Sequence, residues 1–264
     1  MDMKKVAISF DIEEFDVPLE NGCDIAFDEQ MRISRYGAER ILDIVTEAGI
    51  KVTFFCTVRF AESAPDLIRR MVEGGHEIAS HGYYHSDFKP EHLLESRQCL
   101  ESLTGVSVYG FRMARMMPVA DSDIAAAGYE YNSSLHPTFI PGRYNHFDKP
   151  AGKFECDGVV QIPASVTPGL RLPLFWLALH NYPMWLYMAL VKWTLRHRGA
   201  LVVYMHPWEF YNLHDIKDLY SLSPIMTHNC GAVLEARLRK LIAELRCDGA
   251  EFVGMHELAV AEWC

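Results

Sequence analysis

Residues 6–15 read VAISFDIEEF, a largely apolar run that passes directly into the acids Asp11, Glu13 and Glu14. Such a run is typical of a buried strand. An acid at its end points into a cleft when the strands of a parallel sheet end together. Asp11 is therefore the first candidate for a residue that carries chemistry, whereas a single acid in a solvated turn is the plainer alternative.

The rest of the chain alternates short β-rich runs with helical ones. We expect strands at residues 6–11, 51–57, 76–80, 108–113, 159–164, 200–205 and 251–255. Helices are expected at residues 36–48, 91–104, 122–127, 184–197 and 232–247, with a further one capped by Ser63 and carrying Pro65 in its first turn. Short connections between alternating strands and helices predict right-handed crossovers and a parallel sheet.

Four residues whose side chains can take part in catalysis or metal binding lie at or just past predicted strand ends: Asp11, His81, Arg112 and His206. A closed or nearly closed barrel suits the chain length as well as an open sheet does. In a barrel the carboxyl ends of the strands converge on one mouth, so this placement favours the barrel.

Composition and charge exclude several classes of protein. Half of the 264 residues are hydrophobic and 23% are charged, which excludes a disordered chain. The net charge of −10 comes without a basic block, so nucleic acid is excluded as a partner. The apolar run after the first lysines is too short for a signal peptide, and we expect a cytoplasmic protein. Seven cysteines without a CxxC pair predict reduced thiols rather than disulfides or a thiolate zinc site.

Residues 172–195 are apolar over a length that would span a membrane. His180, Asn181 and Pro183 interrupt this segment, and proline breaks a helix. We therefore expect a buried loop and helix, and no transmembrane helix. The alternatives are a Trp- and Tyr-rich patch peripheral to a membrane or against a lipid tail, and an interface in a homo-oligomer.

Three further motifs carry functional groups. SHGYYH (80–85) places His81 and His85 at i and i+4, a spacing at which both imidazoles meet one metal ion, although 12 histidines make a chance pair plausible. Arg112 in GFRM (110–113) should face a carboxylate if it is buried, and is a surface residue otherwise. His206 in YMHPWEF (204–210) suits proton transfer in an apolar pocket, or is a core histidine bonded to a carbonyl.

Together these segments resemble the polysaccharide deacetylase family (carbohydrate esterase family 4, the NodB-homology domain), in the branch with an Asp-x-Glu first motif and a His-Pro-Trp-Glu last motif. The resemblance runs from about residue 5 to 210 through SFDIEEF, KVTFFCT, GGHEIASHGYYH, GFRMA, EYNSS and VVYMHPWEF. It implies a distorted (β/α)7–8 barrel, taken as one catalytic domain over residues 1–264, and a metal-dependent hydrolase of an N-acetyl group or a related amide.

The resemblance also implies roles. Glu13, His81 and His85 match the metal ligands, with Zn²⁺ expected and Co²⁺, Ni²⁺ or Fe²⁺ compatible with similar ligands. Asp11 matches the general base, Arg112 the residue that pairs with it, and His206 the general acid. The backbone amide of Met113 matches the group that binds the oxyanion, and Trp208 matches a substrate contact.

Two positions depart from the family pattern. Glu13 is one methylene longer than the usual Asp, which leaves Glu14 as the alternative ligand. Asn132 stands where the family often has an acid that orients the catalytic histidine, so we expect His206 to be a weaker acid. His136 and His146 are less favoured substitutes for it.

Three functions remain open at this stage. The first is N-deacetylation of a small or lipid-linked saccharide. The second is hydrolysis of a cyclic amide or ureide on the same fold. The third is non-catalytic glycan binding by a degraded site.

Overall fold

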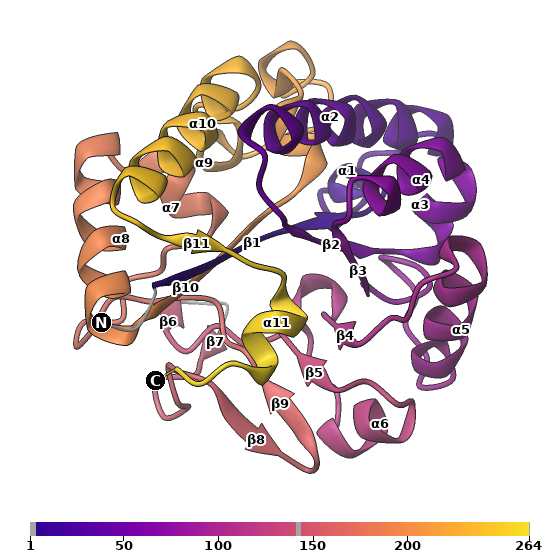
Figure 1. Cartoon of the computed structure of the whole chain (residues 1–264). Helices are drawn as coiled ribbons and strands as arrows, with labels where there is room; N and C mark the ends of the chain where they lie inside the picture. The colour runs from indigo at the N-terminus through magenta and orange to yellow at the C-terminus, as the bar shows by residue number, and fades with distance from the viewer. Residues whose placement is uncertain (1–3, 141–143, 264) are drawn as a thin grey trace.

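The structure is a computed structural model that describes residues 4–140 and 144–263. Its centre is a curled, largely parallel sheet in the order β10 (Ala200–Met205), β1 (Lys5–Ile12), β2 (Thr53–Cys56), β3 (Glu77–Ser80), β4 (Gly110–Phe111), β5 (Tyr131–Asn132), β9 (Val159–Gln161) and the antiparallel β8 (Phe154–Cys156). A further strand, β11 (Glu251–Phe252), pairs with the start of β1. Figure 1 shows the long helices arranged around the outside of this sheet.

The sheet curls into an incomplete barrel. Just beyond β9, the backbone N–H of Ser165 donates to the carbonyl of Val202 in β10 at 2.9 Å, and Ser165 Oγ accepts from Val202 N at 2.8 Å. These contacts join the two sides of the curl without forming a pair of strands. The expectation of a distorted α/β barrel is confirmed, and its distortion lies at this seam.

The helices pack on the outer face of the sheet and bury its apolar side chains. The long ones are α2 (Phe27–Ala48), α4 (Pro65–Glu73), α5 (His92–Thr104), α8 (Met184–Arg198) and α10 (Ala232–Cys247). In α2, Gly37 lies against the loop after β10, where an added Cβ would come within 1.7 Å of the carbonyl oxygen of Pro207. This close approach holds the loop that carries His206 against the core.

Shorter elements surround the ends of the strands. They are α1 (Val17–Glu20), α3 (Val58–Ser63), η1 (Ala114–Met116), α6 (Asp121–Ala126), β6 (Phe139–Ile140), β7 (Tyr144–Asn145), α7 (Trp176–Asn181), η2 (Pro207–Phe210), η3 (Leu213–Asp215), α9 (Pro224–Thr227) and α11 (Met255–Val260).

Several expected boundaries were wrong. Helix α2 begins at Phe27 rather than at residue 36, because its first turns pack Met31 and Ile33 into the core. Ser63 does not cap a helix: it ends α3, and its hydroxyl donates to the carbonyl of Arg59. The strands expected at 108–113, 159–164 and 251–255 keep only two or three residues each, and α11 occupies the end of the last one.

The apolar segment 172–195 forms two helices, α7 and α8, with Pro183 between them. Within the described residues, every helix is too short or too polar to cross a membrane. The six described cysteines are all free thiols. Cys264, the seventh, lies outside the described residues.

Candidate metal and catalytic site

The carboxyl ends of β1, β3 and β10 open onto one cavity of about 310 Å³. Asp11 lies near the end of β1, and His81 and His206 directly follow β3 and β10. All three line the cavity, together with Glu13 and His85 from the loops that continue these strands. The structure therefore brings residues from distant parts of the sequence to one mouth of the barrel.

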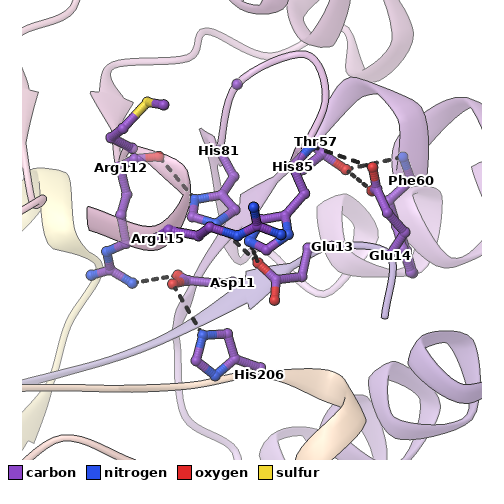
Figure 2. Close-up of polar contacts among 12 residues, drawn as sticks. Asp11, Glu13, Glu14, Thr57, Phe60, His81, His85, Arg112, Arg115 and His206 are labelled. Carbon is purple, nitrogen blue, oxygen red and sulfur yellow. Dashed lines mark hydrogen bonds and ion pairs between the residues drawn. The ribbon is translucent and has the colours of Figure 1, made fainter. Parts of the chain in front are cut away.

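Glu13, His81 and His85 form a buried cluster whose ligand atoms all lie within 4.8 Å of one another. Glu13 Oε2 is 3.0 Å from Nε2 of each imidazole. Figure 2 shows the carboxylate of Glu13 facing the two histidines. Gly82 has a φ of +87°, a value that glycine adopts readily, and it turns the chain between the two histidines. Two imidazoles and one carboxylate are a donor set that suits a first-row divalent ion and leaves further positions for water and substrate.

Each ligand is oriented by a second contact. His81 Nδ1 donates to the carbonyl of Arg112 at 2.8 Å, and His85 Nδ1 donates to Asp16 Oδ1 at 2.7 Å. These bonds turn both Nε2 atoms toward Glu13. Trp208 Nε1 donates to the other Glu13 oxygen at 3.0 Å. Such outer contacts are typical of metal sites, where they fix the tautomer and the ring orientation.

Glu14 faces away from the cluster. Its Oε2 accepts from Thr57 Oγ1 at 2.8 Å, and its Oε1 accepts from the backbone N–H of His85 at 3.3 Å. Glu14 therefore supports the loop that carries His85, and Glu13 supplies the carboxylate of the cluster (Figure 2).

Without a metal ion, Glu13 is stabilised as a carboxylate and His85 holds its proton tightly. Burial by itself would raise the pKa of Glu13, but the imidazoles of His85 and His206 and the bonds from His81 lower it well below its usual range. Burial would likewise lower the pKa of His85, yet Glu13 and Asp16 raise it to about 10. A cation that binds here must displace a proton from His85.

Arg112 is fully buried beneath the cavity and contacts Asp11. Its Nη1 donates to Asp11 Oδ1 at 2.5 Å and to Ser9 Oγ at 3.0 Å. Its Nε donates to the carbonyl of Ser133 at 3.0 Å, and its guanidinium lies 4.0 Å from the centre of the Phe55 ring. These contacts hold Asp11 rigidly, so that Asp11 Oδ2 lies 3.8 Å from His206 Nε2.

His206 is oriented by a carboxylate that the sequence analysis did not assign. Its Nδ1 lies 2.6 Å from Glu209 Oε1, three residues further along the chain. Asn132, the position expected to leave His206 without an acid, instead donates to Gln161 Oε1 at 3.1 Å. Asn132 therefore does not leave His206 without a carboxylate partner, because an acid within η2 reaches the histidine directly. The Glu of His-Pro-Trp-Glu was the available signal.

His136 and His146 do not replace His206. His136 lines the cavity and stacks on Phe175 and Tyr204, with ring centres 4.6 and 5.5 Å away. His146 lies in the loop after β7, where its backbone N–H donates to the carbonyl of Thr138.

Both expected substrate donors are already engaged within the protein. The backbone N–H of Met113 donates to Ser134 Oγ at 2.8 Å, and the Trp208 indole N–H donates to Glu13. Met113 and Trp208 still line the cavity. In this conformation, however, neither N–H is directed at a substrate oxygen.

Comparison with known proteins identifies a family and a shared fold. Residues 3–131 match the family model for polysaccharide deacetylases. A chitooligosaccharide deacetylase of Sinorhizobium fredii (strain NBRC 101917 / NGR234) is 45% identical over 47 residues, which is 18% of this chain and only 22% of that protein.

Two solved structures share the fold over nearly the whole chain. A polysaccharide deacetylase homologue from Mycobacterium smegmatis superposes with a TM-score of 0.67 at 23% identity, covering 98% of this chain and 90% of that one. A Puue allantoinase superposes with a TM-score of 0.64 at 19% identity and the same coverage. Identities this low indicate a common fold only.

Proposed function

This chain is a member of the polysaccharide deacetylase family, and on that premise we propose that residues 1–264 form one metal-dependent hydrolase domain that removes an N-acetyl group from a saccharide. The observation that carries the proposal is the arrangement of the cavity. A complete His–His–carboxylate cluster lies between a buried acid held by Arg112 and a histidine held by Glu209. A complete cluster of this kind argues against a degraded glycan-binding site.

The proposed mechanism assigns a proton acceptor and a proton donor to different residues. A divalent ion held by Glu13, His81 and His85 would polarise the amide carbonyl and activate water, and zinc is the ion that we expect. Asp11 accepts the proton of the attacking water. Because Arg112 occupies Asp11 Oδ1, the acceptor is Oδ2, the oxygen that faces His206.

His206 then donates a proton to the leaving amine. Its pKa is raised although burial would lower it, because the charges of Glu13, Glu209 and Asp11 surround it. A raised pKa favours the protonated imidazole that a general acid requires, and Glu209 and Asp11 would keep this effect when a bound ion offsets the charge of Glu13. Because the Met113 amide is bonded to Ser134, stabilisation of the oxyanion would fall mainly to the ion.

The mouth of the cavity favours a small substrate or the end of a chain. Glu20 in α1 pairs with Arg115 Nε at 2.7 Å, and Asn21 Nδ2 donates to the carbonyls of Tyr220 and Ser221 at 3.2 Å. The α1 turn therefore connects the loop that carries Arg115 to residues 220–221. A site bounded in this way suits a terminal N-acetylated unit better than the middle of a polymer.

The walls above the polar cluster are apolar. They include residues 175–177 at the start of α7, together with Met116, Ile140, Ile225 and Met226. This lining suits the apolar face of a sugar or the lipid of a lipid-linked saccharide. The part of the apolar segment beyond Pro183 packs as α8, and its Trp185 is 73% exposed.

Metal analysis and an acetate assay together test the proposal. We expect one zinc per chain, and release of acetate from N-acetylated chitooligosaccharides with a free amine formed at one end of the chain. Ring opening of a cyclic ureide without acetate release would establish the second function instead. Saccharide binding without turnover, across several divalent ions, would leave only a binding role.

A further inference from the structure

Beyond His206 lies a second buried histidine that the proposed mechanism does not use. Glu209 Oε2 is 2.8 Å from His180 Nε2, and His180 Nδ1 is 2.8 Å from the backbone carbonyl of His228. Glu209 and His180 are both completely buried. The three side chains therefore form a continuous series from the cavity into the protein, in the order His206, Glu209, His180.

Hydrogen-bond chemistry determines where the protons of this series lie. The carbonyl of His228 can only accept, so His180 Nδ1 must carry a hydrogen. His180 Nε2 and Glu209 Oε2 would repel each other if both presented lone pairs at 2.8 Å. One additional proton therefore lies between them, and the His180–Glu209 pair has no net charge.

The same reasoning fixes the tautomer of His206. Glu209 Oε1 accepts from the backbone N–H of His206 at 2.7 Å and from its Nδ1 at 2.6 Å. Nδ1 therefore carries a hydrogen, and the exchangeable proton is on Nε2, which faces Asp11 and the cavity. The neutral His180–Glu209 pair, which is hydrogen-bonded to Nδ1, favours this tautomer. It attracts the positive charge of a protonated His206 less strongly than an isolated carboxylate would.

We propose that His180 is a positioning residue, which shares a buried proton with Glu209 and thereby keeps His206 a stronger acid than a bare carboxylate partner would allow. The role in acid catalysis rests on the proposed function, whereas the shared proton does not. Consistent with a charged acceptor, the pKa of Glu209 is lowered despite the opposing effect of burial, because His180 and His206 bond to it.

Other ionisable groups also lie near the series. Asp11 and Glu13 act on His206 from β1 and the turn that follows it. From α10, Arg237 donates to the carbonyls of Leu179 and Tyr182 at the end of α7. These groups are still present when His180 is replaced, so a shift in the titration midpoint of His206 would report the loss of the shared proton.

Two replacements of His180 separate charge from structure. Glutamine places an amide N–H near the position of Nε2 and keeps a bond to Glu209, whereas asparagine places one near Nδ1 and keeps the bond to His228. Neither carries the additional proton. His256→Gln is the matched control, because it removes a 2.9 Å contact with Glu130 at a distance from the cavity.

The decisive measurement is the titration midpoint of His206, followed by NMR in zinc-treated protein with ¹⁵N-labelled histidine and by the pH profile of kcat/KM. Loss of the positive charge leaves Glu209 uncompensated and should raise the midpoint by about one to two pH units in both His180 variants, the range for a unit charge roughly 6–12 Å away at an effective dielectric constant of about 20. Glu209→Gln should lower it, and His256→Gln should leave it unchanged.

The proposal is overturned if His180→Gln, folded as judged by circular dichroism, titrates like the wild type. A purely structural role would also be indicated if glutamine restored the midpoint and asparagine did not. If the wild type releases no acetate, the proposed function fails, but the NMR titration still decides whether the proton is shared.

Discussion

Replacing Asp16 by Asn tests how a buried acid outside the ligand set controls metal binding. Asp16 accepts from His85 Nδ1 at 2.7 Å and from Arg115 Nη2 at 3.0 Å. It acts in two opposite ways: it makes His85 a better ligand, and it helps to raise the pKa of His85 to about 10, so that protons compete with the metal.

The two effects depend differently on pH, so the net change in zinc affinity should vary with pH. Loss of an outer contact of this kind typically weakens metal binding by roughly 10- to 100-fold, or about 1.4–2.8 kcal/mol. In Asp16→Asn the pKa of His85 falls, so the variant has less competition from protons near neutral pH. We therefore compare the Kd for zinc of the variant with that of the wild type. The ratio of the two should be small near pH 7, and it should grow toward roughly 10- to 100-fold as the pH rises to the range in which His85 of the wild type loses its proton.

Competition with a chromophoric chelator at several pH values would measure this ratio. Glu20→Gln is the matched control, because it removes the other carboxylate on Arg115 and leaves His85 untouched. The reasoning fails if the ratio is the same at low and high pH, or if Glu20→Gln weakens zinc binding as much as Asp16→Asn.

The other predictions concern the ligands themselves. His81→Ala should lose both zinc and turnover; turnover without bound metal in this variant would exclude the proposed mechanism. Glu13→Gln should lose zinc while Glu14→Gln keeps it, as elemental analysis would show, because only Glu13 faces the imidazoles. In metal-free protein, the pKa of His85 is raised from 6.5 to about 10, so its stabilisation is complete below pH 6.5 and is lost as the pH rises toward 10. Urea unfolding should show this loss in the metal-free protein and not in the zinc-loaded one.

Much of the fold follows from local patterns in the sequence. The strand Ala200–Met205 and the helix Ala232–Cys247 were predicted with their observed bounds, because each is a periodic apolar run between clear boundaries. The start of α2 was missed because residues 27–35 are rich in charge and gain their helical structure from packing. The two-residue strands β4 and β5 are set by pairing with their neighbours and have no strong local signal.

The site divides in the same way. The residue types were readable from the motifs: an i, i+4 pair of histidines, an acid after a buried strand, an arginine and a histidine at strand ends. Which oxygen faces which nitrogen was not readable, because Glu13 and Glu14 are adjacent in the chain and differ only in the direction that the turn gives them. Asp16 was missed for the same reason.

The amino-acid sequence thus established which functional side chains are present and at which strand ends they lie. The three-dimensional structure decided the partners: Glu13 rather than Glu14 beside the imidazoles, Asp16 behind His85, and Glu209 with His180 behind His206. Periodicity reports contacts between near neighbours along one element. Contacts such as that of His180 with Glu209, 29 residues apart, arise only when the elements pack and buried polar atoms must find a hydrogen-bonding partner.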